Sequence, residues 1–369
     1  PDKFGNALID AWLATQGRRP ESFNAVERLC YVGVRGMGAL EFAPANGPPL
    51  RRSAKVRVDE LVKLASRVLA HRSSLQVSFA PGRRHDGLTQ ILRVGTSAGG
   101  ARAKAIVAWN RNTNEIRSGQ VKAPAGFDYW LLKFDGVTAN KDKELDDPKG
   151  YTVIEYAYAL MAADAGIEIS ECRLLEEGGR RHFMTRRFDR LTDGAKLHMQ
   201  SLGALGHYDY NSAGAHSYEQ AIDVIKRLGL PMRAREQQFR RMIFNVVARN
   251  QDDHVKNIAF LMDKSGDWSL SPAFDVTYAY NPAGLWTSRH QMSINGKTDD
   301  FRREDFEAVA RVAGLKRGRP ASILAEVIDT VREWPRYART AGVLHAQRDK
   351  INRTLRLRFD RQGVLTSRT

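Results

Sequence analysis

Cysteine is scarce in this sequence. Its 369 residues include only Cys30 and Cys172, which lie far apart and form no C-x-x-C pair. This scarcity argues against a zinc framework and favours a reducing compartment. No apolar run approaches the roughly 18 residues that a membrane-spanning helix needs, and no signal-peptide pattern is present. We therefore expect neither a membrane-spanning helix nor a secreted protein held together by structural zinc.

Acidic residues are too few to balance the basic ones. The 42 Asp and Glu residues face 58 Lys and Arg residues, which gives a net charge of +16 and a pI near 10.0. Such a charge favours an acidic partner, namely nucleic acid, nucleotide phosphates or an acidic protein surface. A basic protein with no special partner is the alternative. The apolar and charged fractions are ordinary for a soluble globular protein, and the length suffices for two or three packed units.

The first half of the chain shows a mixed pattern of helices and strands. Apolar residues recur at helical spacing in 2–18, 58–71 and 151–165, which predicts three helices. Short apolar runs bounded by turn residues predict the strands. These are a hairpin or strand pair in 29–42, a strand on each side of the glycine-rich stretch 94–105, a strand at 129–134, and two strands within 167–190.

From about residue 190 onward, helical patterns dominate. The segments 217–228 and 236–249 are amphipathic, with apolar residues on one face. A polar loop follows, and then a β-hairpin is predicted from strands at 258–262 and 268–271. After residue 300 the chain reads as helical and arginine-rich.

The polar loop 250–257 is the richest in potential chemistry. Asp252 and Asn257 lie five residues apart, and Asp275 follows the predicted hairpin. Phosphoryl transfer needs a carboxylate near the incoming hydroxyl and oxygen ligands that hold magnesium against the phosphates. Asp252 suits the first role, Asn257 and Asp275 suit the second, and Lys256 could neutralise the moving phosphoryl group. A solvated loop with capping residues is the alternative.

A histidine in the same loop raises a competing hypothesis. Asp252, Asp253 and His254 could together ligate zinc or manganese in a metal-dependent hydrolase. However, no second histidine follows three or four residues later, and consecutive side chains point in different directions. A histidine that packs as a support for the loop is therefore favoured.

The glycine-rich stretch is neither a Walker motif nor a dinucleotide fingerprint. Lys104 is not followed by Ser or Thr, and G-x-G-x-x-G is absent. Backbone N–H groups at Gly99 and Gly100 could still cradle phosphates, with Thr96 and Ser97 close to a γ-phosphate. A plain glycine-rich hairpin is the alternative.

A lysine interrupts the apolar strand predicted at 129–134. Lys133 must reach water or a partner, because an unpaired buried ammonium is costly. Kinases use a strand lysine of this kind to hold the α- and β-phosphates, with a helix glutamate to steady it. Glu155, in the next predicted helix, is the candidate partner. An edge-strand lysine that faces solvent is the alternative.

Taken together, these motifs resemble the HipA family of bacterial Ser/Thr kinases, the toxin halves of HipA–HipB toxin–antitoxin modules. The resemblance runs over nearly the whole chain and is carried by 129–134, 186–190, 250–257 and 271–275. The opening residues 1–5 are similar to a proline–aspartate–glycine start that is common in the family core. We therefore expect the family's preceding β-rich segment to be missing here or supplied by another chain.

The resemblance implies an α+β, two-lobed, protein-kinase-like fold. Residues 1–188 would form the N-lobe with the phosphate loop and the nucleotide lysine. Residues 189–369 would form a mostly helical C-lobe with the catalytic loop and a metal-binding aspartate. ATP and magnesium would bind between the lobes, and the γ-phosphoryl group would pass to a Ser or Thr hydroxyl.

The resemblance also implies roles for individual residues. Asp252 is similar to the catalytic base, and Asn257 and Asp275 are similar to the magnesium ligands. Ser97 is similar to the loop serine that family members autophosphorylate, with Thr96 as the alternative. The nucleotide would contact the phosphate loop at 99–104, the lysine pair, the hinge over adenine at 186–188, and the catalytic loop. Those candidates are Ser97, Gly99, Gly100, Ala101, Arg102, Lys104, Lys133, Glu155, Arg186, Arg187, Phe188, His254, Asn257, Phe274 and Asp275.

The same resemblance implies partners. We expect an aminoacyl-tRNA synthetase as the protein substrate, a HipB-like helix-turn-helix antitoxin, contact with DNA through the antitoxin complex, and a bacterial cytoplasmic location. Two alternatives stay open. One is a DNA-associated transcriptional autoregulator that acts with an antitoxin, and the other is the metal-dependent hydrolase.

Overall fold

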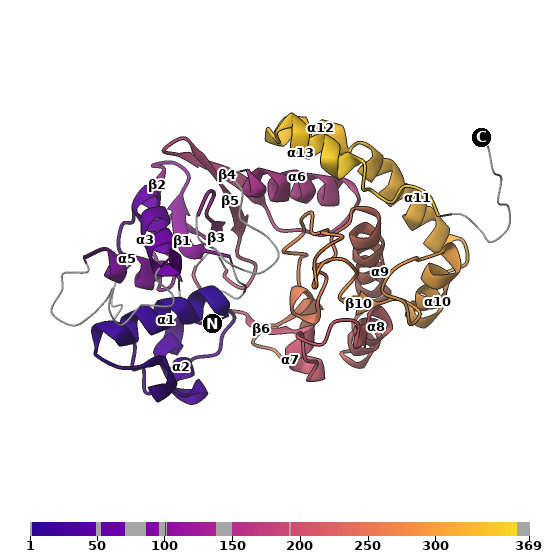
Figure 1. Ribbon diagram of the computed structural model, residues 1–369. Coiled ribbons are helices and arrows are strands. Elements are labelled where there is room, and N and C mark those ends of the chain that lie inside the picture. The colour runs from indigo at the N-terminus through magenta and orange to yellow at the C-terminus, as the bar shows by residue number, and fades with distance from the viewer. Residues whose placement is uncertain are drawn as a thin grey trace. The chain divides into compact units, whose positions relative to one another are not determined.

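The computed structural model describes residues 2–48, 53–70, 86–95, 100, 102–137, 150–191 and 193–359. The chain divides into two compact units (Figure 1). Unit 1 comprises Pro1–Tyr156 and Ser170–Met199, and unit 2 comprises Ala157–Ile169 and Gln200–Thr369. Helix α6 (Tyr151–Asp164) begins in unit 1 and ends in unit 2. The lobe boundary predicted at residue 188 stays a prediction.

Unit 1 is built on a five-stranded antiparallel sheet in the order β2-β1-β3-β5-β4. Its strands are β1 (Lys104–Asn110), β2 (Glu115–Ser118), β3 (Asp128–Lys133), β4 (Cys172–Glu177) and β5 (Arg180–Arg186). Gly178 and Gly179 both have positive φ, which suits the two-residue turn between β4 and β5. The strands predicted at 129–134 and within 167–190 are confirmed.

Three helices share one hydrophobic core with this sheet. They are α1 (Lys3–Thr15), α3 (Val58–Ala70) and α5 (Asp86–Gly95). The core includes Phe4, Leu8, Val62, Val107 and Trp130, which come from α1, α3, β1 and β3. The helical spacing seen in 2–18 and 58–71 therefore reflects the faces that α1 and α3 bury, and both predicted helices are confirmed.

Two predictions for unit 1 are wrong. The strand pair predicted in 29–42 is instead α2 (Ala25–Val32) followed by a 3-10 turn, because Asn24 and Glu27 form a capping box that starts a helix. The strand predicted before the glycine-rich stretch is the end of α5. A Cβ at Gly95 would lie 2.5 Å from a Leu8 methyl carbon. That glycine therefore permits close helix packing, and it does not begin a loop.

Unit 2 is mostly helical. Its helices are the second part of α6, α7 (Leu202–Gly206), α8 (Tyr218–Arg227), α9 (Met232–Val247), α10 (Arg303–Ala313), α11 (Arg319–Arg332), α12 (Trp334–Ala341) and α13 (His345–Asn352). The core face of α9 includes Phe239, Met242, Ile243 and Val246, all fully buried. The predicted amphipathic helices are confirmed, and the helical region predicted after residue 300 is confirmed as far as Asn352, where α13 ends.

Short strands complete unit 2. The strands β6 (His198–Ser201), β8 (Ala259–Met262) and β9 (Trp268–Leu270) form a sheet in that order, and β8 and β9 are the predicted hairpin. The pair β7 (His216–Ser217) and β10 (Met292–Ser293) is parallel. Among the described residues, no helix has both the length and the apolar character that crossing a membrane requires.

Candidate active site

Unit 1 contains a buried ion pair between β3 and α6. Lys133 Nζ lies 2.6 Å from Glu155 Oε1, and the two side chains are only 10% and 3% exposed. Strand β3 is the central strand of the sheet, so the alternative of an edge-strand lysine facing solvent is wrong. The predicted partner, Glu155, is the residue that neutralises the ammonium, as a buried charge requires.

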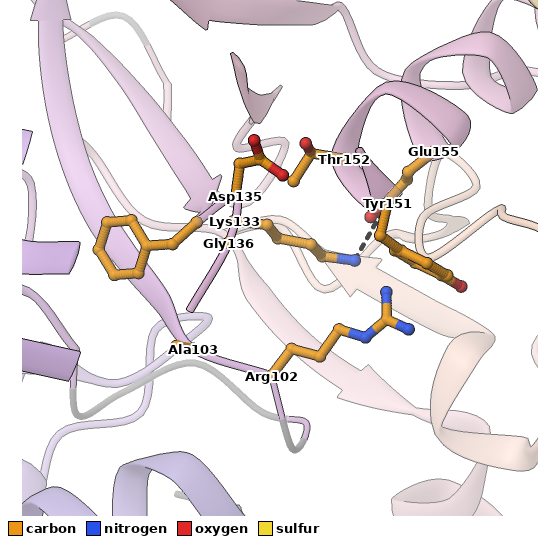
Figure 2. A pocket seen from close by; sticks show the side chains of 9 residues that line it. Arg102, Ala103, Lys133, Asp135, Gly136, Tyr151, Thr152 and Glu155 are labelled. Carbon is orange, nitrogen blue, oxygen red and sulfur yellow. Dashed lines mark hydrogen bonds and ion pairs between the residues drawn. The ribbon is translucent and has the colours of Figure 1, made fainter. Parts of the chain in front are cut away.

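The ion pair lies beside a small hollow in unit 1. Figure 2 shows Lys133 and Arg102 both reaching toward Tyr151, and the Arg102 guanidinium lies 3.3 Å from the Tyr151 ring centroid. Two cationic groups at one hollow can bind an anion such as a phosphate. The residues that line the hollow are Arg102, Ala103, Lys133, Phe134, Asp135, Gly136, Tyr151, Thr152 and Glu155.

The described part of the predicted phosphate loop is attached to the start of the chain. The backbone N–H of Gly100 donates to Asp2 Oδ2 at 3.1 Å, while Asp2 Oδ1 accepts from the Lys3 N–H at the start of α1. A Cβ at Gly100 would lie 2.6 Å from Lys104 Nζ, so this ammonium lies close to the loop. The other candidates of this loop, Thr96, Ser97, Gly99 and Ala101, lie outside the described residues.

A buried histidine supports the end of β3. His182 Nδ1 accepts a hydrogen bond from the Asp135 N–H at 2.9 Å. Burial lowers the pKa of His182 to about 4, so the imidazole is neutral near pH 7. Its role is to fix the backbone at Asp135, which lines the hollow. No pattern in the sequence points to this role, since a single histidine on a strand has many possible functions.

The predicted hinge residues take part in ion pairs. Arg186 Nη2 donates to Asp128 Oδ1 at 2.8 Å. Arg187 donates from Nε and Nη2 to the two carboxylate oxygens of Asp189 at 2.8 and 2.7 Å, deep in the unit. Asp189 also accepts from the Gly38 N–H at 2.6 Å. The Asp189 carboxylate therefore links Arg187 to the loop at Gly38. Contact of 186–188 with adenine stays a prediction.

Unit 2 brings together three residues of the catalytic-loop prediction. Asn257 Nδ2 donates to the Asp252 carbonyl oxygen at 2.8 Å, across the 3-10 turn Val255–Asn257. Asp252 Oδ1 accepts from the Trp286 indole Nε1 at 3.0 Å, and its side chain is 43% exposed. Lys256 Nζ lies 3.8 Å from the Tyr210 ring centroid. Residues 252–257 thus form one compact loop in which the Asp252 carboxylate is accessible.

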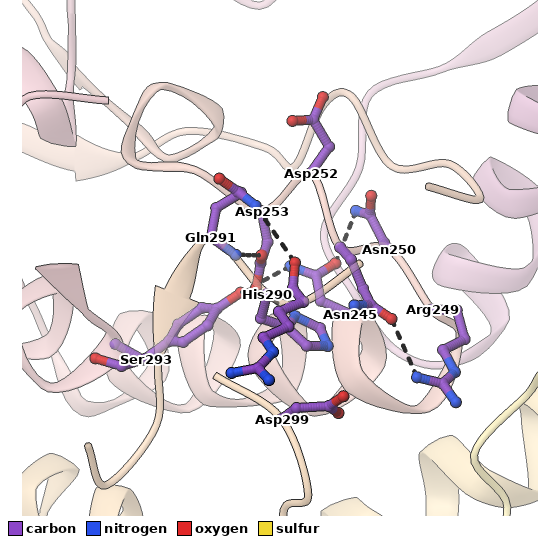
Figure 3. A network of polar contacts seen from close by, with 12 residues as sticks. Asn245, Arg249, Asn250, Asp252, Asp253, His290, Gln291, Ser293 and Asp299 are labelled. Carbon is purple, nitrogen blue, oxygen red and sulfur yellow. Dashed lines mark hydrogen bonds and ion pairs between the residues drawn. The ribbon is translucent and has the colours of Figure 1, made fainter. Parts of the chain in front are cut away.

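The neighbouring acid, Asp253, points into the core of unit 2. Its carboxylate accepts hydrogen bonds from Tyr218 Oη at 2.7 Å, His290 Nδ1 at 2.8 Å and the Gln291 N–H at 2.8 Å. Burial alone would raise the pKa of Asp253, but His290 and these hydrogen bonds hold it below its ordinary value. Figure 3 shows Asp252 directed away from this network.

This geometry removes the basis of the hydrolase hypothesis. The Asp253 carboxylate is enclosed by its three donors in the core of unit 2, whereas Asp252 is directed away from that network (Figure 3), so the three consecutive residues do not converge on one point. Across the ranges that the structure describes, no three His, Cys, Asp or Glu side chains gather in a way that could hold a metal ion. The proposed zinc or manganese trio is therefore wrong.

The second predicted magnesium ligand, Asp275, lies after β9. Its φ is +53°, in the left-handed region that costs energy for a residue with a side chain. The preceding residues are fixed, because Arg241 Nη2 donates to the Ser271 carbonyl at 2.8 Å and the Ala273 N–H donates to the Glu168 carbonyl at 2.7 Å. Metal binding by Asp275 and nucleotide contact by Phe274 stay predictions.

Comparison with known protein families gives a match over most of the chain. A family model described as the HipA-like C-terminal domain matches residues 96–334. Two curated relatives are also similar. "Putative kinase Y4mE" of Sinorhizobium fredii is 27% identical over 142 residues, which are 36% of this chain and 34% of that protein. A "Putative kinase" of Haemophilus influenzae is 28% identical over 134 residues, 33% of this chain and 39% of that protein. The matched region thus spans little more than a third of either relative.

A solved structure shares the fold. It is the Shewanella oneidensis HipA, HipB and operator DNA complex, in which the matching chain has a TM-score of 0.60 and 16% sequence identity. The match covers 88% of this chain and 74% of that chain. This likeness confirms the predicted α+β architecture of the HipA-like, kinase-like type.

Proposed function

Because the chain belongs to the HipA-like C-terminal domain family, we propose that it is an ATP- and magnesium-dependent kinase of Ser or Thr hydroxyls. The buried Lys133–Glu155 pair at the edge of a hollow is the observation that carries this proposal. Kinases use such a pair to hold the α- and β-phosphates of ATP. The loop that joins Asp252 to Asn257 supplies the second element that phosphoryl transfer requires.

Residues of unit 1 would bind the phosphates. Lys133 would contact the α- and β-phosphates while Glu155 keeps its ammonium in place. Arg102 is held against Tyr151 at the same hollow and would supply a second positive group. Lys104, close to Gly100, would contribute charge from the neighbouring strand.

Residues of unit 2 would hold the metal and accept the proton. Asn257 uses its Nδ2 to donate to the Asp252 carbonyl, so Oδ1 is the atom of its amide that suits a cation. Asn257 and Asp275 would hold magnesium, which supplies charge neutralisation for the phosphates when bound. The accessible Asp252 carboxylate would accept the proton of the incoming hydroxyl, and Lys256 would offset charge on the transferred group.

We further propose a toxin–antitoxin role. The structurally similar chain comes from a complex of HipA, HipB and operator DNA, and the net charge of +16 suits an association with nucleic acid. On this basis we propose a HipB-like antitoxin as partner, DNA contact through that complex, and an aminoacyl-tRNA synthetase as substrate. Autophosphorylation would occur at Ser97 or Thr96.

The test is incubation with γ-labelled ATP and magnesium, followed by mass spectrometry. Wild type should place label on Ser97 or Thr96, and Asp252→Gln should reduce labelling by about 100-fold or more, because the base contributes that much to the rate. Asp223→Gln, at an exposed position on α8, is the matched control and should label like wild type. If unmodified wild type labels neither itself nor any protein of a bacterial lysate, the proposal is wrong.

A further inference from the structure

The segment 286–291 contacts both acids of the catalytic loop. At one end, the Trp286 indole donates to Asp252 Oδ1 at 3.0 Å. At the other end, the Gln291 N–H donates to Asp253 Oδ1 at 2.8 Å. Within the segment, the Gln291 side-chain amide donates to the Trp286 carbonyl. Two consecutive carboxylates that point in different directions are therefore both held by one short stretch of chain.

The Asp253 end of this contact is rigidly anchored. Asp253 also accepts from His290 Nδ1 and from Tyr218 Oη, and Tyr218 in turn accepts from Asn245 Nδ2 at 3.0 Å. Tyr218 belongs to α8 and Asn245 to α9. A buried carboxylate with three donors is costly to disturb, since each lost partner leaves a polar group unsatisfied. The anchor therefore fixes 286–291 against the loop.

The Asp252 end, by contrast, is partly exposed, and the Trp286 indole is one of the groups that contact it. Its side chain is 43% exposed, and an exposed aspartate can occupy several rotamers. His254 Nε2, at 3.8 Å from the same oxygen, is beyond hydrogen-bond distance. The Trp286 indole is within that distance. It donates one hydrogen bond and accepts none, so it can orient the carboxylate without competing for the substrate proton.

We propose that Trp286 is a positioning residue for Asp252. The indole N–H sets the orientation of the carboxylate toward the incoming hydroxyl, and the anchor at Asp253 keeps Trp286 in place. This inference rests on the proposed function, because Asp252 must be the base for its orientation to affect the rate. Correct orientation of a reacting group is itself a large part of catalysis.

Trp286→Phe tests the role, because it removes the N–H and keeps an aromatic ring. We expect kcat for autophosphorylation to fall about 10-fold, with KM for ATP unchanged within about twofold, since a misoriented base slows transfer without weakening nucleotide binding. Trp268→Phe, on β9, is the matched control and should keep the wild-type kcat. The inference is wrong if Trp286→Phe leaves kcat unchanged or raises it. It is also wrong if the loss of kcat is matched by a rise in KM.

A second measurement does not depend on activity. The chain has six tryptophans, and Trp286→Phe identifies the indole N–H resonance of Trp286 in a ¹⁵N spectrum. Asp252→Ala should shift that resonance upfield and speed its exchange with water, while the other five stay in place. A resonance that does not respond overturns the inference even if phosphoryl transfer occurs. If the resonance responds to Asp252→Ala but the wild-type protein shows no phosphoryl transfer, the proposed function is wrong. The positioning role, which depends on that function, is then wrong as well.

Discussion

Each unit buries an acid–base pair beside residues proposed for catalysis, but the two pairs differ in their surroundings. In unit 1, Lys133 and Glu155 meet at 2.6 Å and both line a hollow that Arg102 also borders. In unit 2, Asp253 and His290 meet at 2.8 Å with side chains that are almost completely enclosed. The first pair lines a small hollow, and the second is enclosed by the core of unit 2.

This difference indicates what each pair is suited to do. A buried ion pair contributes little net stability, because desolvation offsets the attraction between the charges. A lysine held ready at a hollow can instead be used to bind an anionic ligand. An enclosed carboxylate with three donors can only maintain the geometry of the chain around it. We therefore propose ligand binding for Lys133–Glu155 and loop positioning for the network around Asp253.

The largest effect is expected from Lys133→Met. It leaves Glu155 buried without its partner, which should lower the free energy of unfolding by about 4 kcal/mol. ATP affinity should also be lost, because the phosphates lose their main cation. Urea unfolding and isothermal titration with ATP and magnesium measure the two effects.

A double variant separates stability from binding. Lys133→Met with Glu155→Leu replaces both charges by apolar groups, so we expect most of the lost stability to return. ATP binding should stay absent. Recovery of ATP binding together with stability would show that Lys133 is only structural, and the contrast between the two pairs would then fail.

A pH effect of intermediate size is expected in unit 1. Burial lowers the pKa of His182 to about 4, below its ordinary value of 6.5. The unfolded chain therefore binds a proton at higher pH than the folded one, so stability is full above pH 6.5 and falls as the pH decreases toward 4. The loss should approach about 3 kcal/mol, at 1.36 kcal/mol per pH unit.

The matched variant for this effect is His182→Asn. Its amide oxygen can still accept from the Asp135 N–H but does not titrate in this range. Urea unfolding between pH 4.5 and 7.5 should give a flatter stability curve for the variant than for wild type. Parallel curves would mean that another group causes the pH dependence.

The sequence predicted the contacts of the candidate site residues better than it predicted the residues that support them, while the chemical roles of the candidates stay predictions. Lys133 was identifiable because a lysine inside an apolar strand needs a partner, and the next helix offered Glu155. The five-residue spacing from Asp252 to Asn257 does form one loop. These predictions succeeded because each depends on local pattern or on a charge that must be satisfied.

The supporting residues could not be found in the same way. Tyr218, Trp286 and His290 lie more than 30 residues along the chain from the aspartates that they contact, and only tertiary packing brings them near. The wrong elements have local causes. The capping box at Asn24 starts a helix where short apolar runs predict strands, and Gly95 allows two helices to pack closely where the glycine-rich stretch predicts a loop.

The smallest effects are expected from the enclosed network of unit 2. Asp253→Asn should lower the free energy of unfolding by about 2 kcal/mol, because the amide presents N–H groups where donors now point. Tyr218→Phe removes the hydrogen bond that Tyr218 donates to Asp253 and the one that it accepts from Asn245, so it should cost about 2 kcal/mol, at about 1 kcal/mol for each. The pKa of Asp253 lies below its ordinary value, so the wild-type advantage should persist at pH 5 and disappear only as the pH falls through that lowered pKa.

The affinity for ATP shows whether the network around Asp253 serves ligand binding, as proposed for the Lys133–Glu155 pair, or only positions the loop. Titration of Asp253→Asn and Tyr218→Phe with ATP and magnesium should give the wild-type affinity, because their side chains lie in the core of unit 2 and do not line the hollow in unit 1. The phosphoryl-transfer rate should fall in Asp253→Asn, since Trp286 loses its anchor. An affinity loss as large as that of Lys133→Met would show that both networks serve ligand binding, and the distinction between a ligand-binding pair and a positioning pair would no longer hold.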